Sequence, residues 1–395
     1  MQKTWIVAAA LLLAAKGVLA QGSFSQQGYG YPPGGLSTRT LSMGGSLAEF
    51  DSQSAANPAA LASWGPAGLY IQYDPEFRYV DLAGGTDRTT TARFPVVAGA
   101  FPMGERGMIG ISASTFLDRT WATSFDQVDT LRGREVVSTQ EFRSEGAVND
   151  VRLGFAYLVR ASLRVGFGLH ALTGENRLTV RRDFRNPDGT LAADSARYAS
   201  FSQNSTLSYG GTAFSAGAEW RPRPSMSVAA SARHGGTIKT RFGEEVQSEA
   251  GVPDRYGVGV RYDGITGTTL AARVNWEGWS SMQGLTLPGL PVSDVVEYGV
   301  GADVAGPRLG GSPILLRVGG RWRELPFGVR AVVFSGLPAA ADIRETAFSG
   351  GIGVPLAAAR VLIDIGAQRA SRSSDTRSDV SEQAWTLSFG LRVRP

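Results

Sequence analysis

The chain has 395 residues, carries no cysteine and is nearly balanced in charge, with 39 Lys and Arg residues against 35 Asp and Glu residues. The absence of cysteine excludes a disulfide framework and a cysteine-based metal site, and the small net charge argues against a general nucleic-acid-binding protein. Glycine is abundant, at 51 residues, and is spread through alternating apolar and polar segments. In strands, such glycines often mark curvature or a close approach of another backbone.

The N-terminus has the pattern of a secretory signal peptide over residues 1–20. Lys3 provides a short positive region, an apolar stretch follows from Trp5 to Ala15, and Val18-Leu19-Ala20 forms a small-residue cleavage site. This apolar stretch is too short to span a bilayer as a helix, and the rest of the chain has no apolar run of about 18 residues. We therefore expect an exported protein without a transmembrane helix.

Residues 21–66 contain no strand pattern. The stretches "GYGYPPGG" and "SMGGS" are rich in turn-forming residues. Further along, Asn57 is a good N-cap and Pro58 suits the first helical position, while Gly65 and Pro66 stop the helix. The sequence predicts a compact segment that ends in about two helical turns over residues 57–66.

Regular alternation begins after residue 66. In "RYGVGVRY", Tyr256, Val258, Val260 and Tyr262 share one face, with Arg and Gly on the other. Period two with one apolar face is typical of a half-buried strand, and each segment has about the 9–13 residues that a tilted strand needs to cross a bilayer. Fourteen such segments begin near residues 68, 91, 107, 149, 162, 207, 225, 254, 267, 295, 313, 345, 359 and 384.

Long and short connections alternate between these segments. The short ones are 102–106, 160–161, 222–224, 264–266, 306–312 and 356–358, and the long ones include 119–147, 174–206, 235–253, 278–294, 324–344 and 371–383. This alternation predicts an all-β, antiparallel up-and-down transmembrane barrel with short periplasmic turns and long outer loops. We divide the chain into a signal peptide (1–20), an N-terminal hatch or plug (21–66) and a barrel (67–395).

The face opposite the apolar residues carries many charges, which we assign to a polar lumen. They are Arg152, Arg164, Glu219, Arg233, Arg261, Arg273, Asp303, Arg317, Arg321 and Asp364. A fourteen-stranded barrel lies between small filled barrels and open porins, so its lumen would leak without a plug. Residues 21–66 are expected to fill it, with a periplasmic tail as the alternative. Aromatic residues near the strand ends suggest interfacial girdles; they are Tyr70, Tyr73, Trp220, Tyr256, Tyr262, Trp276, Trp279, Trp322 and Trp385.

The stretch "LSTRTLSMGGSLAEFDSQSAANPAALA", residues 36–62, resembles the N-terminal hatch of the FadL-type outer-membrane transporters. The matching residues are Gly44-Gly45, Asp51 and Asn57-Pro58-Ala59. The resemblance implies a fourteen-stranded barrel with a hatch, passive transport of hydrophobic compounds such as long-chain fatty acids, and a hatch or gating role for Gly44, Gly45, Asp51, Asn57, Pro58 and Ala59. Two features depart from the expected pattern: the chain ends in Pro395 rather than an aromatic residue, and no ligand-contacting residues can be matched.

A second group, the PorV-type outer-membrane proteins, has a similar opening, and its members are partners of secreted proteins. A scaffold in a secretion system is therefore the alternative function. As a transporter, the protein would be a monomer in the cell outer membrane after signal-peptide cleavage. Its expected partners are a hydrophobic small molecule or lipid, outer-membrane lipids and lipopolysaccharide, and the barrel-assembly machinery during biogenesis, with no nucleic acid.

Pro95 lies inside the second expected strand, "TARFPVVAGAF". Proline cannot donate to the ladder and is confined to bulges or breaks in a closed barrel. Gly107 and Gly110 in the third strand permit a bend, so we expect a lateral gap in the wall beside strands two and three. FadL-type proteins have a lateral opening at a kinked third strand. The alternative is a proline without consequence near the periplasmic rim.

No catalytic or cofactor pattern is visible. The chain has two histidines, with His170 in phase with the lumen and His234 in phase with the lipid face, and no nucleophile elbow is present. Two histidines on opposite faces do not make a metal site. The sequence predicts neither an enzyme nor a cofactor.

Overall fold

The structure is a computed structural model that describes residues 30–82, 85–131, 134–185, 200–286, 292–309, 312–327, 343–374 and 380–395. The expected signal peptide, residues 1–20, and the start of the expected hatch, residues 21–29, lie outside these ranges. Among the described residues, no helix is long and apolar enough to cross a membrane.

The described chain consists of strands with three short helices. The helices are α3 (Thr38–Ser42), η1 (Pro58–Ser63) and η2 (Trp279–Leu285). The strands are β1 (Gly68–Leu82), β2 (Gly85–Arg93), β3 (Val96–Met103), β4 (Gly107–Asp118), β5 (Trp121–Leu131), β6 (Arg134–Arg160), β7 (Leu163–Arg185), β8 (Phe201–Arg223), β9 (Met226–Phe242), β10 (Glu245–Gly251), β11 (Arg255–Ile265), β12 (Thr268–Glu277), β13 (Val295–Leu309), β14 (Ser312–Leu325), β15 (Ile343–Leu356), β16 (Val361–Ser374) and β17 (Val380–Val393).

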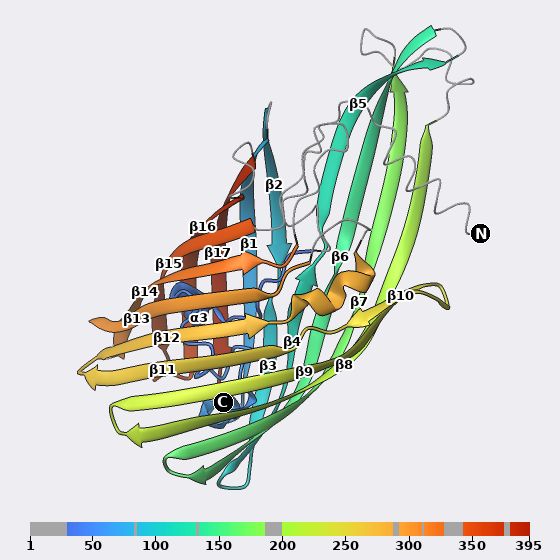
Figure 1. Cartoon of the computed structure of the whole chain (residues 1–395). Coiled ribbons are helices and arrows are strands. Elements are labelled where there is room, and N and C mark those ends of the chain that lie inside the picture. Colours follow the sequence, from blue (N-terminus) through green and yellow to red (C-terminus); the bar gives the residue numbers. More distant parts are fainter. Residues whose placement is uncertain are drawn as a thin grey trace.

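These strands form one antiparallel sheet that closes into a barrel (Figure 1), because β1 pairs with β17 at one side and with β2 and β3 at the other. We call each strand position of the barrel a stave, whether one or two of the named strands occupy it. Three staves are interrupted: β2 continues as β3, β4 as β5, and β10 as β11. In the described residues the seventeen named strands therefore make a fourteen-stranded closed barrel. The predicted fold class and strand count are confirmed.

The alternation of the sequence determines which face is exposed. On β11, Tyr256 is 51% exposed on the outer face, whereas its neighbour Arg255 is 7% exposed in the lumen. Two members of the expected aromatic girdles differ, because Tyr70 and Trp279 are each only 1% exposed and lie inside. Tyr70 hydrogen-bonds to Thr38, and Trp279 belongs to an apolar cluster in the lumen.

Several strands are longer than a bilayer requires. Where the structure describes them, the stretches 119–147 and 174–206, expected as long outer loops, are largely strand, and the β6–β7 ladder runs from Arg160↔Leu163 to Val137↔Arg185. The upper parts of β5 to β8 form an arm that rises beyond the rest of the barrel (Figure 1). Polar and charged residues occur on both faces of these parts, so no continuous apolar face forms and period-two hydrophobicity does not reveal them.

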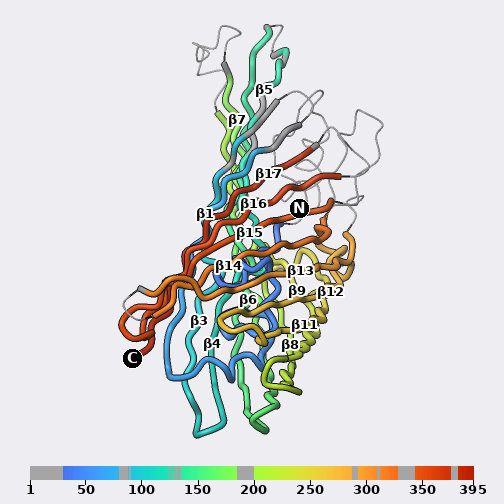
Figure 2. Tube along the Cα trace, turned by 90° about the vertical axis from the view of Figure 1, so that its left-hand side faces the viewer, coloured from blue at the N-terminus to red at the C-terminus, as the bar shows by residue number. Residues whose placement is uncertain are grey.

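Residues 30–66 lie inside the barrel, where Figure 2 shows the N-terminal segment, in blue, surrounded by strands. Helix α3 contacts β14 to β17, and η1 contacts β4, β6, β7 and β8. The approach is close because the wall carries glycine at the contacts: a Cβ on Gly166 would meet the backbone of Pro58 and Ala59, and one on Gly319 that of Met43. The glycine content of the strands thus makes room for this segment.

Candidate functional site

Asp51 organises the first half of the interior segment. Its carboxylate accepts hydrogen bonds from Ser37 Oγ at 2.5 Å, Ser54 Oγ at 2.8 Å and Thr40 Oγ1 at 3.0 Å. Ser37 also caps α3 by accepting from the Thr40 backbone N–H at 3.1 Å. The acidic residue of the motif therefore joins α3 to the chain that follows it, and it is 5% exposed.

Gly44 and Gly45 form the turn after α3. Both have a positive φ, +63° and +80°, a region that residues with a Cβ rarely adopt. A Cβ on Gly44 would overlap the backbone of Gly320 in β14. The pair is needed for the turn and for the close approach to the wall.

The Asn57-Pro58-Ala59 part of the motif begins η1. Asn57 Oδ1 accepts from the Ala59 N–H at 2.9 Å, and its Nδ2 donates to the Glu49 carbonyl at 3.0 Å. Pro58 occupies the first turn, as its missing N–H allows. The helix predicted here is a 3-10 helix, with Leu61 packed under Gly110 of the wall, where a Cβ would lie 2.9 Å from the leucine Cδ1.

Ion pairs join the interior segment to the wall. Glu49 accepts from Arg273 at 3.0 Å, and Arg39 donates to Asp303 at 3.0 Å. The ten charges that the sequence places in the lumen are all buried or half-buried. Most lie within 4 Å of an opposite charge, which offsets the cost of their burial.

The wall is interrupted next to Pro95. Asp74 pairs with Arg93 on β2, but Ile71 pairs with Val97 on β3, so one extra residue is accommodated around Pro95. Below this bulge, in the view of Figure 1, β3 pairs with both β1 and β4. Above it, in the described residues, β2 pairs with β1 alone and β5 pairs with β6 alone. The edges of β2 (85–93) and β5 (121–131) that lie opposite these pairings flank a break in the ladder.

Gly107 and Gly110 lie below this break, in the regularly paired part of β4. The irregularity of the third stave falls instead at Phe116, between Thr115 and Leu117. The lower corner of the break is closed by a hydrogen bond from Thr115 N to the Pro95 carbonyl, at 3.1 Å. Gly110 serves the contact with η1, as described above.

The N-terminal segment substitutes for a strand at this corner. Tyr31 and Asp118 exchange two backbone hydrogen bonds of 2.9 Å, so Tyr31 pairs with the edge of β4 that β3 has left. Arg93 of β2 donates to the Asp118 carboxylate at 2.5 Å, which joins the two sides of the break. These contacts were not predicted, because Tyr31 carries no local signal and its partners lie far along the chain.

An apolar cluster occupies the lumen on the outer side of the interior segment. At its centre Phe116 stacks on Trp279 of η2, with ring centroids 5.2 Å apart, and Phe327 meets Trp279 edge-on at 5.8 Å. The other buried members are Leu117, Val148, Leu172, Tyr209, Ala213, Ile238, Val252, Met282, Leu285 and Val295. Phe116 lies two residues after Ser114, the last β4 residue paired with β3, so the cluster reaches the break in the wall.

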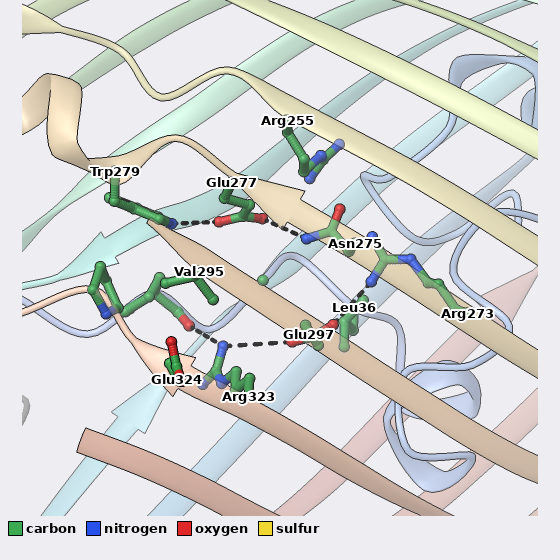
Figure 3. Close-up of a pocket in the computed structure, with 13 residues that line it drawn as sticks. Leu36, Arg255, Arg273, Asn275, Glu277, Trp279, Val295, Glu297, Arg323 and Glu324 are labelled. Carbon is green, nitrogen blue, oxygen red and sulfur yellow. Dashed lines mark hydrogen bonds and ion pairs between the residues drawn. The ribbon is translucent and has the colours of Figure 1, made fainter. Parts of the chain in front are cut away.

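Two small cavities lie between this cluster and the interior segment. Their volumes are about 20 and 30 Å³, enough for one or two water molecules, and both are lined by Pro32, Gly34, Arg255, Glu277 and Trp279. Figure 3 shows the Trp279 indole N–H pointing to Glu277, to which it donates at 2.6 Å. Neither of these two cavities is large enough for a hydrophobic solute in this conformation.

His170 forms a buried polar chain that the sequence did not reveal. Its Nδ1 lies 2.8 Å from Asp150 Oδ1 and its Nε2 lies 2.8 Å from Ser215 Oγ. The order Ser–His–Asp is that of a hydrolase triad, but neither cavity reaches Ser215. We interpret the chain as part of the polar lining. In the described ranges, no three His, Asp or Glu side chains gather in a way that would hold a metal ion.

No family model and no curated protein matches the sequence. Solved structures match over almost the whole chain: a FadL homologue of Pseudomonas aeruginosa (TM-score 0.61, 12% identity, 92% of this chain and 99% of the other), the toluene transporter TbuX of Ralstonia pickettii (0.57, 13%, 91% and 98%) and the toluene transporter TodX of Pseudomonas putida (0.54, 12%, 92% and 98%). At these identities the likeness is one of architecture, and it confirms the resemblance noted in the sequence. The chain has the fold of the FadL-type outer-membrane channels.

Proposed function

We propose that the protein is an outer-membrane channel that takes up hydrophobic compounds passively and releases them sideways through the wall. Such compounds cross a polar sugar layer poorly but partition well into apolar pockets, at roughly 0.8 kcal/mol per buried CH₂ group. The observation that carries the proposal is the break between β2 and β5, which the apolar cluster reaches at Phe116.

The position of the apolar residues supports a channel over a secretion scaffold. A scaffold is expected to present a broad apolar patch on its outer parts. Here Trp279, Met282 and Leu285 of the outer connection after β12 are buried in the lumen with Phe116. A hydrophobic solute arriving from outside would exchange contacts with these side chains.

We propose that residues 30–66 act as the hatch. We keep the predicted limits, 21–66 for the hatch and 67–395 for the barrel. The ion pairs of Glu49 and Arg39 with the wall and the glycine contacts of α3 and η1 support a tight fit. A solute that leaves through the wall does not have to displace α3 or η1 from their contacts with the wall. Lateral release therefore costs fewer contacts than passage along the barrel axis.

For the substrate we propose only a chemical class. Two of the similar structures are named toluene transporters, and one is a FadL homologue. Aromatic hydrocarbons and long-chain fatty acids are therefore the two classes to compare. The proposal assigns no catalytic step to the chain.

The test measures uptake in a Gram-negative host without its own channel for these compounds. Cells that express the chain should take up radiolabelled toluene or hexadecanoate at least several-fold faster than cells with the empty vector. Cell fractionation and heat-modifiable migration on gels check that the protein is folded in the outer membrane. Uptake equal to that of the vector for both compounds, by a correctly inserted protein, would reject the channel.

A further inference from the structure

Four arginines of the barrel wall surround the ring of Tyr31. Their guanidinium carbons lie 4.4 Å (Arg372), 5.0 Å (Arg93), 5.2 Å (Arg323) and 5.5 Å (Arg78) from the ring centroid. Cations over an aromatic face attract the ring quadrupole, and the attraction is greatest at sites removed from water. Tyr31 is 4% exposed, and we call these four residues the arginine cage.

The hydroxyl group of Tyr31 is held as specifically as the ring. It donates to Glu345 Oε2 at 3.0 Å and accepts from Arg323 Nη2 at 2.6 Å. A ring without a hydroxyl group would leave a buried carboxylate oxygen and a buried N–H without these bonds. The site is therefore matched to a phenol rather than to a plain hydrocarbon ring.

The cage does not depend on Tyr31 for its own charge balance. Arg78 pairs with Glu76, and Arg93 reaches Glu76 and Asp118 at 2.8 and 2.5 Å. Arg323 and Arg372 both reach Glu345 at 2.7 Å, and Arg372 also pairs with Glu382, so four carboxylates balance the four arginines. All of these residues belong to strands of the wall, so removing the tyrosine ring would leave a preformed site.

The cage also lies on the route proposed above. Tyr31 holds the free edge of β4 through its backbone bonds to Asp118, at the lower corner of the break. On its other side, the smaller of the two cavities reaches Arg323 and Pro32, the residue that follows Tyr31. A solute that replaced the Tyr31 side chain would stand between the lumen and the gap.

We propose that the arginine cage is a binding site for a hydroxylated aromatic ring, and that Tyr31 is its built-in occupant. The inference rests on the proposed function for the route and deepens it by naming phenols as a substrate class. A phenol takes the place of the Tyr31 side chain, and the loss of that anchor frees the N-terminal segment from the edge of β4. Phenol binding is then coupled to loosening of the lower corner of the break.

The test uses the purified full chain in detergent and two probes, p-cresol, which is the tyrosine side chain itself, and toluene. The Tyr31→Ala variant should bind p-cresol about tenfold or more tightly than toluene, since toluene forms neither hydrogen bond. Wild-type protein should bind p-cresol about tenfold or more weakly than the variant, because Tyr31 competes for the site. The Tyr31→Phe variant keeps the ring and loses the two hydrogen bonds, so its p-cresol affinity should lie between those of wild type and Tyr31→Ala. This variant also guards against a folding defect of the alanine variant.

Hydrogen exchange of wild-type residues 30–36 supplies the second readout. Saturating p-cresol should speed their exchange, while toluene at the same occupancy of the apolar cluster should not. Equal affinities of Tyr31→Ala for the two probes, equal p-cresol affinities of wild type and Tyr31→Ala, or unchanged exchange at saturating p-cresol would each overturn the proposal. Toluene uptake by wild-type cells is the separate test of the channel, so the two proposals fail independently.

Discussion

At the scale of single residues, the local parts of the hatch motif follow from the sequence and the distant contacts do not. Asn57 and Pro58 begin a helix through their own backbone neighbours, so their position could be predicted. Tyr31 is held by residues 78, 93, 323 and 372, which no spacing in the sequence brings together. Asp51 lies between these cases, since its three hydroxyl partners lie within 14 residues but depend on the fold of the whole segment.

The Asp51→Ala substitution should loosen the hatch and leave the barrel intact. It leaves the hydroxyl groups of Ser37, Thr40 and Ser54 without their common acceptor, and each unsatisfied buried group costs about 1–3 kcal/mol. We expect faster hydrogen exchange across residues 36–56, with unchanged exchange in β11 to β13. Asp126→Ala, at an exposed carboxylate that accepts from Thr139, is the matched control. Wild-type exchange in Asp51→Ala would show that the carboxylate does not hold the segment.

At the scale of the elements, apolar alternation locates strands wherever lipid covers one face. It placed all fourteen staves, but it missed the extensions of β5 to β8, where polar residues lie on both faces and no continuous apolar face forms. It also missed α3, whose only sequence signal is the N-cap Ser37. Pro95 did carry a usable signal, because a residue without an N–H is poorly tolerated in a continuous ladder.

The Pro95→Val substitution should restore an N–H at the bulge and favour continued pairing of β2 with its neighbour strands. If solutes leave through the break, their uptake should fall several-fold while the barrel remains folded and heat-stable. Pro102→Val is the matched control, because Pro102 lies in the same stave, is paired with Met108 and is far from the break. Wild-type uptake by a well-folded Pro95→Val protein would count against lateral release at this site.

At the scale of the whole molecule, the strand count and the alternation of short and long connections were enough to predict a closed barrel. The residues that fill it could not be placed by the same reasoning, because a segment in the lumen and a tail in the periplasm have the same local sequence pattern. Their placement depends on matched surfaces, such as α3 against the glycines of β15 to β17 and Glu49 against Arg273.

Deletion of residues 21–66 should convert a closed barrel into a conducting one. The deletion removes α3, η1 and Tyr31, and water can then solvate the lumen charges that the segment had covered. In planar bilayers the deletion variant should show large ion currents, whereas the full chain should be nearly silent. Equal conductance of two folded proteins would indicate that the lumen is closed by something other than this segment.

A disulfide between the hatch and the wall separates lateral release from passage along the barrel axis. A Cβ on Gly366 of β16 would contact Ser42 Oγ of α3, while the Ser42 Cβ is farther away than the 3.6 Å of the third-nearest atom. The two Cβ atoms are therefore at about the separation that a disulfide requires, so the double variant Ser42→Cys, Gly366→Cys has suitable geometry. The chain has no other cysteine, so the oxidised and reduced forms of one preparation are each other's control. If solutes leave between β2 and β5, fixing α3 to β16 does not obstruct them, and uptake of toluene into proteoliposomes should be equal within about twofold in the two forms. A channel that releases solutes past the hatch into the periplasm would instead lose uptake on oxidation and regain it on reduction, and that result would exclude the lateral route.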